Sequence, residues 1–535
     1  MTETGKTGDE IRRERWERTR WFREARFGMF IHWGLYAIPA RGEWVRSHEK
    51  LSEEDYRPFF EQFNPTAYDP RQWAAIAKDA GMKYAVLTAK HHDGFCLWDS
   101  ALTDYKCTNT PCGRDLVAEY VEAFREAGLG VGLYYSLPDW RHPDYPAWGD
   151  RQHPMRDNPE FQGREHNWPR YVEYLHGQVR ELLSEYGKID IAWFDFSYGE
   201  YIAEKWRAAE LVTMARRLQP HLLIDDRLGY CMHDETPAVF GGDFAGPEQG
   251  IPAECLRDKL GNEMPWEACI TLNDHWGYCA ADENYKTPAD VIRTLVHCVS
   301  KNGNLLLNVG PDALGRIPEP SAAILREVGQ WLRTNGRSIY GCGAADLPRP
   351  DWGRFTRKGD TLYAHVTEQV IGQIPLAGLG GKVKQARRLC DGAEVILSGL
   401  WNADVDGRRR RPVHGAGQAG AAYLPPAGPG GHGDRTEPLA GGVRAKPVDT
   451  AWSCGYGYAF CRGRWPAWAE RSVWIPNVET PNGIRKEQSP WQSRLALTVS
   501  VASAGSCSAR WRSARMNSKL SASTTSPAPT PWRFC

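Results

Sequence analysis

The sequence has no net charge, because its 66 basic residues are matched by 66 acidic ones. It therefore lacks the basic excess that marks many proteins that bind nucleic acid or an anionic membrane. It also lacks an apolar run approaching the ~20 residues that cross a bilayer. The charged stretch 1–20 has no apolar segment of the kind found in signal peptides. We expect a soluble, cytoplasmic protein without nucleic-acid or membrane partners, and a homo-oligomer is compatible with this composition.

Signatures of common cofactors are also missing. No G-x-G-x-x-G stretch follows an early strand pattern, which argues against a dinucleotide-binding enzyme. The 14 cysteines are scattered through strand and helix patterns, and the close pair Cys107 and Cys112 has no second pair to complete a zinc site. We therefore expect most cysteines to be reduced packing residues, and we expect no cofactor and no metal.

Strand and helix patterns alternate over the first 345 residues. Amphipathic helix patterns cover 115–127, 171–186, 287–299 and 321–334, with recognisable cap residues at their ends. Buried strand patterns cover 27–33, 83–89, 130–136, 189–194, 222–226, 268–272 and 304–309. Such alternation is typical of a parallel α/β fold. Polar residues follow at least five of these strands, whereas an open sheet concentrates its ligand groups at one switch point, so we favour a (β/α)8-like TIM barrel.

Asp195 ends the strand pattern 189–194 and is our candidate nucleophile. A single aspartate after a strand more often caps the next helix, but other polar residues follow neighbouring strand patterns. His91 and His92 would point to opposite faces of a regular strand, which makes them a poor metal chelate. They are better suited to hydrogen-bond a polyhydroxylated substrate. The acid and aromatic side chains of Glu43 and Trp44 suit a sugar in the same way.

The chain resembles the α-L-fucosidases of glycoside hydrolase family 29 over about its first 345 residues. The motifs that carry the resemblance occur in the expected order: RFGMFIHWGLYAIPARGEW from Arg26, YAVLTAKHHDGFCLWDS from Tyr84, WFD from Trp193, WGY from Trp276 and KNGNLLLNVGPDALG from Lys301. The resemblance implies a catalytic barrel, retaining chemistry without a metal, and a fucosylated oligosaccharide or glycoside as substrate. It continues through a small β-module to about residue 398.

The resemblance also implies roles for individual residues. Asp195 falls at the position of the family's nucleophile. Retention requires a second carboxyl about 5 Å away that acts as acid and base, for which we favour Glu248, with Glu267 as the alternative. Glu267 has a competing structural interpretation, in which it only orients its strand. The positions that match the fucose-binding residues of the family are His32, Glu43, Trp44, His91, His92, Tyr134 (with Tyr135 as the alternative), Trp193 and Arg227.

The pattern changes after the expected barrel. Short strand patterns at 361–366, 382–389 and 394–397 predict a β-sandwich-like module over 346–400, which lacks an expected final strand. The region 401–535 has a basic run at 408–411, a Gly/Pro-rich stretch and unpatterned tryptophans, so we predict that it is irregular or disordered. A shifted coding frame after about residue 400 would explain this composition.

Two other classes of protein fit part of the pattern. A metal-dependent TIM-barrel hydrolase could use His32, His91, His92 and Asp195, and a chelator would inactivate it. A non-catalytic carbohydrate-binding protein would keep the aromatic and histidine side chains but would need neither carboxylate. Binding of a fucoside without turnover would identify the second class.

Overall fold

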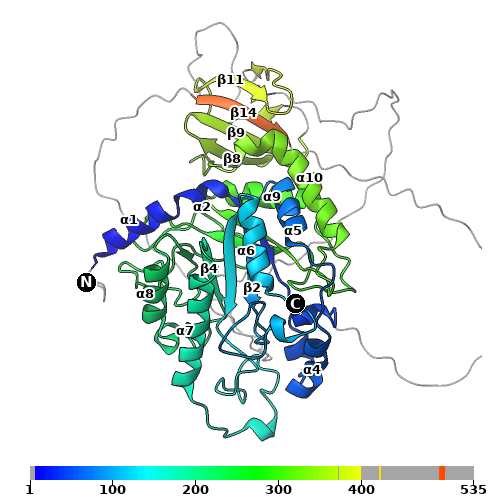
Figure 1. Cartoon of the computed structure of the whole chain (residues 1–535). Helices are drawn as coiled ribbons and strands as arrows, with labels where there is room; N and C mark the ends of the chain where they lie inside the picture. Colours follow the sequence, from blue (N-terminus) through cyan, green and yellow to red (C-terminus); the bar gives the residue numbers. More distant parts are fainter. Residues whose placement is uncertain (1–5, 371–372, 399–420, 423–492, 500–535) are drawn as a thin grey trace, which may run out of the picture. The chain divides into compact units, whose positions relative to one another are not determined.

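The computed structural model of the chain describes residues 6–370, 373–398, 421–422 and 493–499 (Figure 1). Its main element is a seven-stranded sheet with the order β5-β4-β3-β2-β1-β7-β6, in which all neighbouring strands are parallel. The strands are β1 (Phe27–Ile31), β2 (Tyr84–Lys90), β3 (Gly130–Ser136), β4 (Ile191–Asp195), β5 (Leu223–Ile224), β6 (Glu267–Thr271) and β7 (Asn304–Val309). They correspond to the seven strand patterns predicted from the sequence. Both faces of the sheet are covered, which explains why the strands read as continuous apolar runs.

The segment 244–248 closes the ring between β5 and β6. Phe244 bridges Asp225, Ala245 bridges Trp266 and Glu248 bridges Cys269, all in parallel. The Glu267 amide donates to the Ala245 carbonyl at 2.9 Å, and the Cys269 amide donates to the Pro247 carbonyl at 3.1 Å. The segment therefore takes the place of an eighth strand and completes the predicted barrel. The sequence indicated only a loop here, because its glycines and proline interrupt the strand pattern.

Alternate residues of the strands point into and out of the barrel. The inward side chains form one buried cluster that includes Phe30, Tyr84, Tyr134 and Trp193. Gly28 on β1 faces Tyr84, and a Cβ at Gly28 would lie 2.4 Å from the tyrosine ring, so glycine leaves the space that this ring fills.

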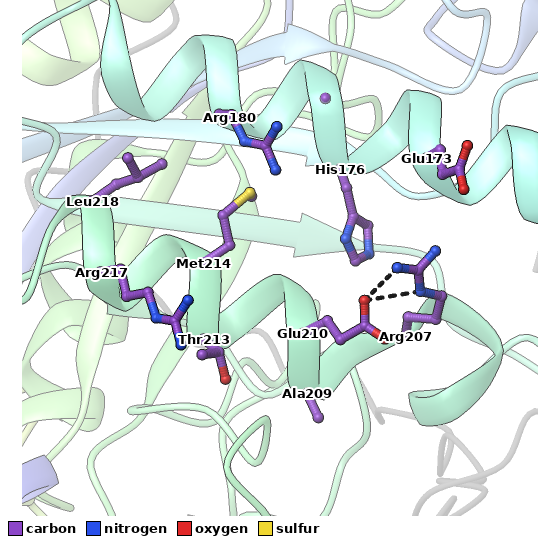
Figure 2. Close-up of a pocket in the computed structure, with 11 residues that line it drawn as sticks. Glu173, His176, Arg180, Arg207, Ala209, Glu210, Thr213, Met214, Arg217 and Leu218 are labelled. Carbon is purple, nitrogen blue, oxygen red and sulfur yellow. Dashed lines mark hydrogen bonds and ion pairs between the residues drawn. The ribbon is translucent and has the colours of Figure 1, made fainter.

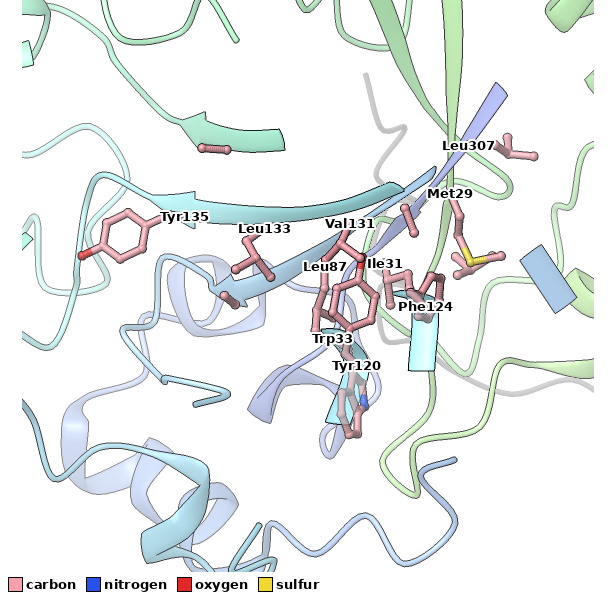
Figure 3. Packing of buried hydrophobic residues seen from close by; sticks show 14 of the residues in the cluster. Met29, Ile31, Trp33, Leu87, Tyr120, Phe124, Val131, Leu133, Tyr135 and Leu307 are labelled. Carbon is pink, nitrogen blue, oxygen red and sulfur yellow. The ribbon is translucent and has the colours of Figure 1, made fainter. Parts of the chain in front are cut away.

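The outward side chains pack against the surrounding helices. Figure 3 shows Ile31, Leu87 and Leu133 from three neighbouring strands beside Tyr120 and Phe124 of a helix. The larger helices of this layer are α5 (Pro70–Asp79), α6 (Leu116–Glu126), α7 (Trp168–Ser184), α8 (Ala208–Leu218), α9 (Pro288–Val299) and α10 (Glu319–Asn335). Helices α3 (Val45–His48) and α4 (Glu53–Gln62) also lie between β1 and β2 in the chain. None of the helices in the described ranges is long and apolar enough to span a bilayer.

The connections 225–243 and 249–266, on either side of the eighth segment, contain no helix. Arginines of the N-terminal helix α1 (Gly8–Arg18), which is followed by α2 (Arg20–Ala25), hold them instead. Arg12 binds Asp258 at 2.7 Å, and Arg18 binds the buried Asp243, one residue before the eighth segment. Helix α1 has no apolar stripe and its buried residue is Arg15, so this helix attaches to the barrel through ion pairs.

The β-module contains two small sheets. One has the order β11-β14-β9-β8 and the other β10-β13-β12. The strands are β8 (Gly353–Lys358), β9 (Thr361–Val366), β10 (Ile374–Pro375), β11 (Val383–Arg388), β12 (Leu397–Ser398), β13 (Ala421–Ala422) and β14 (Ser493–Val499). A separate buried cluster that includes Trp352, Phe355 and Leu362 supports them.

Strand β14 comes from the region that the sequence predicts to be irregular. It pairs in parallel with both β9 and β11 and so supplies a strand that the predicted module lacked. The other residues of 401–535, apart from β13, lie outside the described residues, so their predicted disorder stays a prediction. The ten cysteines of the described ranges are free thiols, as expected for reduced packing residues.

Candidate active site

A pocket lies at the carboxyl ends of the barrel strands. Asp195 ends β4, His32 follows β1, His91 follows β2, and Arg227 follows β5. Chemistry in parallel barrels is found at this end. The pocket is lined by Phe30, His32, Trp44, His91, His92, Tyr134, Trp193, Asp195, Phe196, Arg227, Glu248, Cys269 and Trp276. The structure thus gathers nine of the sequence-predicted site residues, Asp195 and Glu248 among them, around one cavity.

The Asp195 carboxylate is held by two hydrogen-bond donors. The Tyr134 hydroxyl donates to Oδ2 at 2.7 Å, and Arg227 Nη1 donates to Oδ1 at 2.6 Å. His92 Nε2 lies 3.9 Å from Oδ2. Charge-assisted donors favour the ionised form of a carboxyl. The Asp195 carboxylate is therefore held in one orientation in the pocket, and its side chain is 13% exposed.

Arg227 joins the two candidate carboxylates. While Nη1 binds Asp195, Nη2 binds Glu248 Oε2 at 2.9 Å. The guanidinium also lies over the Trp193 ring, with its carbon 4.5 Å from the ring centre. Burial alone lowers the pKa of Arg227, but Asp195 and Glu248 outweigh this effect and raise it above its usual value. One planar cation therefore brings the two carboxylates to the same side of the cavity.

The histidines of the pocket are neutral and held by the protein. His92 Nδ1 lies 2.7 Å from Ser136 Oγ, and this hydroxyl donates to the Pro138 carbonyl, so it accepts the proton of Nδ1. Burial lowers the pKa of both His32 and His92 to about 3. His91 Nδ1 is buried and has no hydrogen-bond partner in the described structure.

Asn308 on β7 sets the orientation of His32. Its Nδ2 donates to the Trp276 carbonyl at 2.7 Å, so its Oδ1 accepts from His32 Nδ1, also at 2.7 Å. Asn308 therefore fixes the tautomer of His32 and anchors the loop that carries Trp276. Sequence reasoning named the motif around Asn308 but not the residue. Its inward position, two residues after the inward Leu306, was the available signal.

The family of this chain is shown by its similarity to known proteins. The sequence model of the family described as Alpha-L-fucosidase matches residues 5–337. The chain belongs to the α-L-fucosidase family. The Alpha-L-fucosidase of Dictyostelium discoideum is 30% identical over 380 residues, which cover 65% of this chain and 77% of the relative.

Solved structures agree with the family match. Alpha-L-fucosidase isoenzyme 1 from Paenibacillus thiaminolyticus is 60% identical, with a TM-score of 0.74, and the match covers 77% of this chain and 96% of that chain. An alpha-L-fucosidase GH29 from Bacteroides thetaiotaomicron, solved as a trapped covalent intermediate with 2-fluoro-fucosyl fluoride, is 28% identical with a TM-score of 0.61 and covers 77% and 94% of the two chains. The predicted family and the predicted barrel are both confirmed.

Three residues named from the sequence lie outside the pocket lining of this α-L-fucosidase family member. The Glu43 carboxylate is buried and accepts the Gly277 amide at 2.8 Å, so it fastens the loop after β1 to the loop after β6. Tyr135 points outward, where its hydroxyl donates to Gln178 at 2.8 Å. Because adjacent strand residues face opposite ways, Tyr134 rather than Tyr135 reaches Asp195.

Glu267 is the third of these residues. It lies at the start of β6 and forms a short hydrogen bond with the Tyr84 hydroxyl, which faces the barrel interior. Trp193 Nε1 is 3.4 Å from its other oxygen. Burial raises the pKa of Glu267 to about 7. Glu267 therefore lies outside the pocket lining and is linked to it by the hydrogen bond from Trp193.

A groove between α7 and α8 has a larger volume than the fucosidase pocket, about 750 Å³ against about 50 Å³. Figure 2 shows that it is lined by helix residues such as His176, Arg180 and Met214, with the Arg207–Glu210 ion pair at one side. It lies on the outer helices, and none of the pocket residues contributes to it. Cavity volume alone would therefore identify the wrong site.

The metal-dependent alternative requires a cluster of ligands. Within the described part of the chain, no group of three or more His, Cys, Asp or Glu side chains is arranged to hold a metal ion. His32 and His92 instead direct one ring nitrogen each to Asn308 and Ser136.

Proposed function

We propose that this chain removes terminal α-L-fucosyl residues by double displacement, with Asp195 as the nucleophile and Glu248 as the acid/base. The predicted retaining α-L-fucosidase function is confirmed by the family match and by the covalent intermediate of the Bacteroides relative. The single observation that supports the two residue assignments is the bridge through Arg227, which places both carboxylates at the same pocket.

The reaction assigns a different task to each carboxyl. Asp195 attacks the anomeric carbon while Glu248 gives its proton to the departing glycosidic oxygen, and a covalent fucosyl-enzyme forms. Glu248 then takes a proton from water, the water attacks the anomeric carbon, and Asp195 leaves. Two inversions give net retention. The exposures of the side chains fit these tasks, because Glu248, at 37%, is more open to leaving group and water than Asp195, at 13%.

The remaining pocket residues suit recognition of a polyol. With Nδ1 of His32 and His92 bound by the protein, the Nε2 atoms are left to accept hydroxyl protons. His91 offers its unpartnered Nδ1. Trp44, Trp193 and Trp276 supply apolar faces against which a sugar ring can pack. The substrate class is a fucosylated oligosaccharide or glycoside, and the cytoplasmic location and a homo-oligomer stay predictions.

Trapping of the intermediate tests the nucleophile. We expect incubation with 2-fluoro-fucosyl fluoride to add one fluorofucosyl group to the peptide that contains Asp195, as seen by mass spectrometry of a digest. NMR of the first product from an aryl α-L-fucoside should show the α anomer. An adduct on another carboxyl would reassign the nucleophile, and a β product would exclude double displacement.

A further inference from the structure

The contact between Arg227 and Glu248 conflicts with the task of a general acid. A guanidinium stabilises the ionised form of a carboxyl that it contacts, whereas a general acid must carry a proton before the bond breaks. Arg227 is buried, with its side chain 8% exposed, and Nη2 also donates to the Gly246 carbonyl at 3.2 Å. The free enzyme therefore presents Glu248 in an ion pair.

The partners of Arg227 show which side of this pair can move. Arg227 is held by Asp195, whose side chain is 13% exposed, by the Gly246 carbonyl and by the face of the buried Trp193. Glu248 is the more exposed partner. Displacement of Glu248 from Arg227 thus leaves the other contacts of the arginine in place.

The charges around Glu248 change once this contact is lost. Several titratable groups interact electrostatically with Glu248 or with its partner Arg227: His32 after β1, His92 after β2, Tyr134 on β3, Asp195 on β4, Asp225, Asp226 and Tyr230 after β5, and Cys269 on β6, beside which lies Glu267. Arg227 is the one permanent cation in this set, and it remains paired with Asp195. A Glu248 side chain without its own contact to Arg227 is left near the Asp195 carboxylate, and a like charge favours the protonated form.

We propose that Glu248 is ionised in the free enzyme and takes up one proton from solvent when the substrate separates it from Arg227. This inference rests on the proposed role of Glu248 as acid/base. A substrate oxygen accepts the N–H that Arg227 Nη2 donated to Glu248, Arg227 keeps its charge, and the solvent proton is bound by the Glu248 carboxylate. After that proton has passed to the leaving group, Asp195 is an uncharged ester, and Arg227 again stabilises ionised Glu248, which the second step needs as a base.

The pH dependence of the rate gives one test. The profile of kcat/KM reports the free enzyme, and the profile of kcat reports the bound enzyme. We expect the alkaline limb of kcat to lie at higher pH than that of kcat/KM, by about one pH unit or more, the size of effect that one neighbouring charge produces. Coincident alkaline limbs would overturn the proposal.

Direct measurement of proton uptake gives the second test. Binding of phenyl 1-thio-α-L-fucoside, a neutral ligand chosen for its resistance to cleavage, is followed by calorimetry in buffers with different ionisation enthalpies. The wild type should take up a proton at pH values near the alkaline limb of kcat/KM, and Glu248→Gln, which binds the same ligand without a titrating carboxyl, should take up none.

The outcomes separate this inference from the proposed function. Wild-type binding without proton uptake, combined with a leaving-group-dependent defect in Glu248→Gln, would overturn the inference and leave Glu248 as the acid/base. Equal uptake in both proteins would assign the proton to another group and would also overturn it. A Glu248→Gln variant with normal rates on every leaving group would refute the proposed function itself.

Discussion

The two candidate carboxylates lie on parts of the barrel that are held in different ways. Asp195 ends β4, a regular strand that pairs with β3 on one side and β5 on the other. Glu248 lies on the eighth segment, which makes only isolated bridges and is held from outside by Arg18 and Arg216 through Asp243. The nucleophile therefore depends on the strand ladder, whereas the acid/base depends on side-chain ion pairs far away in the sequence.

The largest expected effect comes from the nucleophile side of this comparison. Asp195→Ala should lower kcat by about 10⁴-fold or more, because no covalent intermediate can form. Folding should be little affected, since the side chain lies at the pocket mouth. Added azide should restore part of the activity and give the inverted β-fucosyl azide. Near-normal turnover in this variant would end the assignment of Asp195.

A smaller and substrate-dependent effect is expected from the acid/base side. Glu248→Ala should slow hydrolysis of fucosides with poor leaving groups far more than that of activated aryl fucosides, since only the former need a proton to depart. Azide should then give the retained α-fucosyl azide. Glu267→Gln is the matched comparison, and if it rather than Glu248→Ala shows this pattern, the role passes to Glu267.

The support of the eighth segment can be tested from the N-terminal helix. Arg18→Ala removes one of two arginines that bind the buried Asp243, so we expect a loss of about 1–2 kcal/mol in the free energy of unfolding, less than for a fully unpaired buried charge. Arg20→Ala, which breaks an exposed pair with Glu17 close by, should cost less than about 1 kcal/mol. Denaturant titration measures both. Equal losses would show that the pairs with Asp243 do not support the eighth segment.

Arg18→Ala and Arg20→Ala should also show whether the positions of Asp195 and Glu248 depend on different contacts, when their rates are compared on two kinds of substrate. If Asp243 positions Glu248, Arg18→Ala should slow poor leaving groups more than aryl fucosides. An equal loss on both substrates would show that the two supports are not independent.

Acid should destabilise the protein through its buried neutral histidines. Burial lowers the pKa of His365 in β9 to about 3, as it does for His32 and His92. Below about pH 6.5 these histidines are protonated in the unfolded chain but stay neutral in the folded chain. Each of them therefore lowers the free energy of unfolding by about 1.4 kcal/mol per pH unit until the pH reaches its folded-state pKa. Unfolding temperatures between pH 7 and pH 4.5 measure this loss.

The variant His365→Gln should show a smaller fall in unfolding temperature between pH 7 and pH 4.5 than the wild type. His221→Gln, at an exposed position, is the matched comparison variant. A wild-type protein whose stability is constant from pH 7 to pH 4.5 would contradict the expectation.

The smallest kinetic effect is expected at the carboxyl end. A chain that stops at Leu400 lacks β14, which lies between β9 and β11, so its thermal stability should fall. Turnover should stay near that of the full chain, because none of the pocket residues comes from beyond Trp276. Limited proteolysis followed by kinetics tests this, and trimming that abolishes activity would contradict it.

The sequence predicted the regular part of this molecule well, for a physical reason. Strands such as β4 are buried on both faces, so their apolar runs and the polar residues that end them are local signals. The inward direction of the Asp195 side chain could also be predicted, because alternate strand residues share a face and Asp195 follows Ile191 and Trp193 at this spacing. The sequence left Tyr134 and Tyr135 undecided, because both are aromatic and only the register of β3 separates them.

The irregular part could not be predicted locally. The eighth segment contains Gly246 and Pro247 and takes its conformation from the strands beside it. Helix α1 is polar on all sides, and its partners Asp243 and Asp258 follow it by more than 200 residues. The hydrogen bond between Asn308 and His32 likewise joins β7 to the end of β1. Each of these features is a long-range contact that one sequence does not reveal.

The absence of helices from the connections 225–243 and 249–266 has a consequence for how this enzyme can diverge. Insertions and deletions in loops cost far less than changes within a packed helix layer. Here the two loops that bracket Glu248 can change length between their fixed points, Arg227, Asp243 and Asp258, without altering a helix of the barrel layer or the strand that carries Asp195. The barrel can therefore adapt the reach of its proton donor to new leaving groups while the atom that attacks the sugar stays where it is.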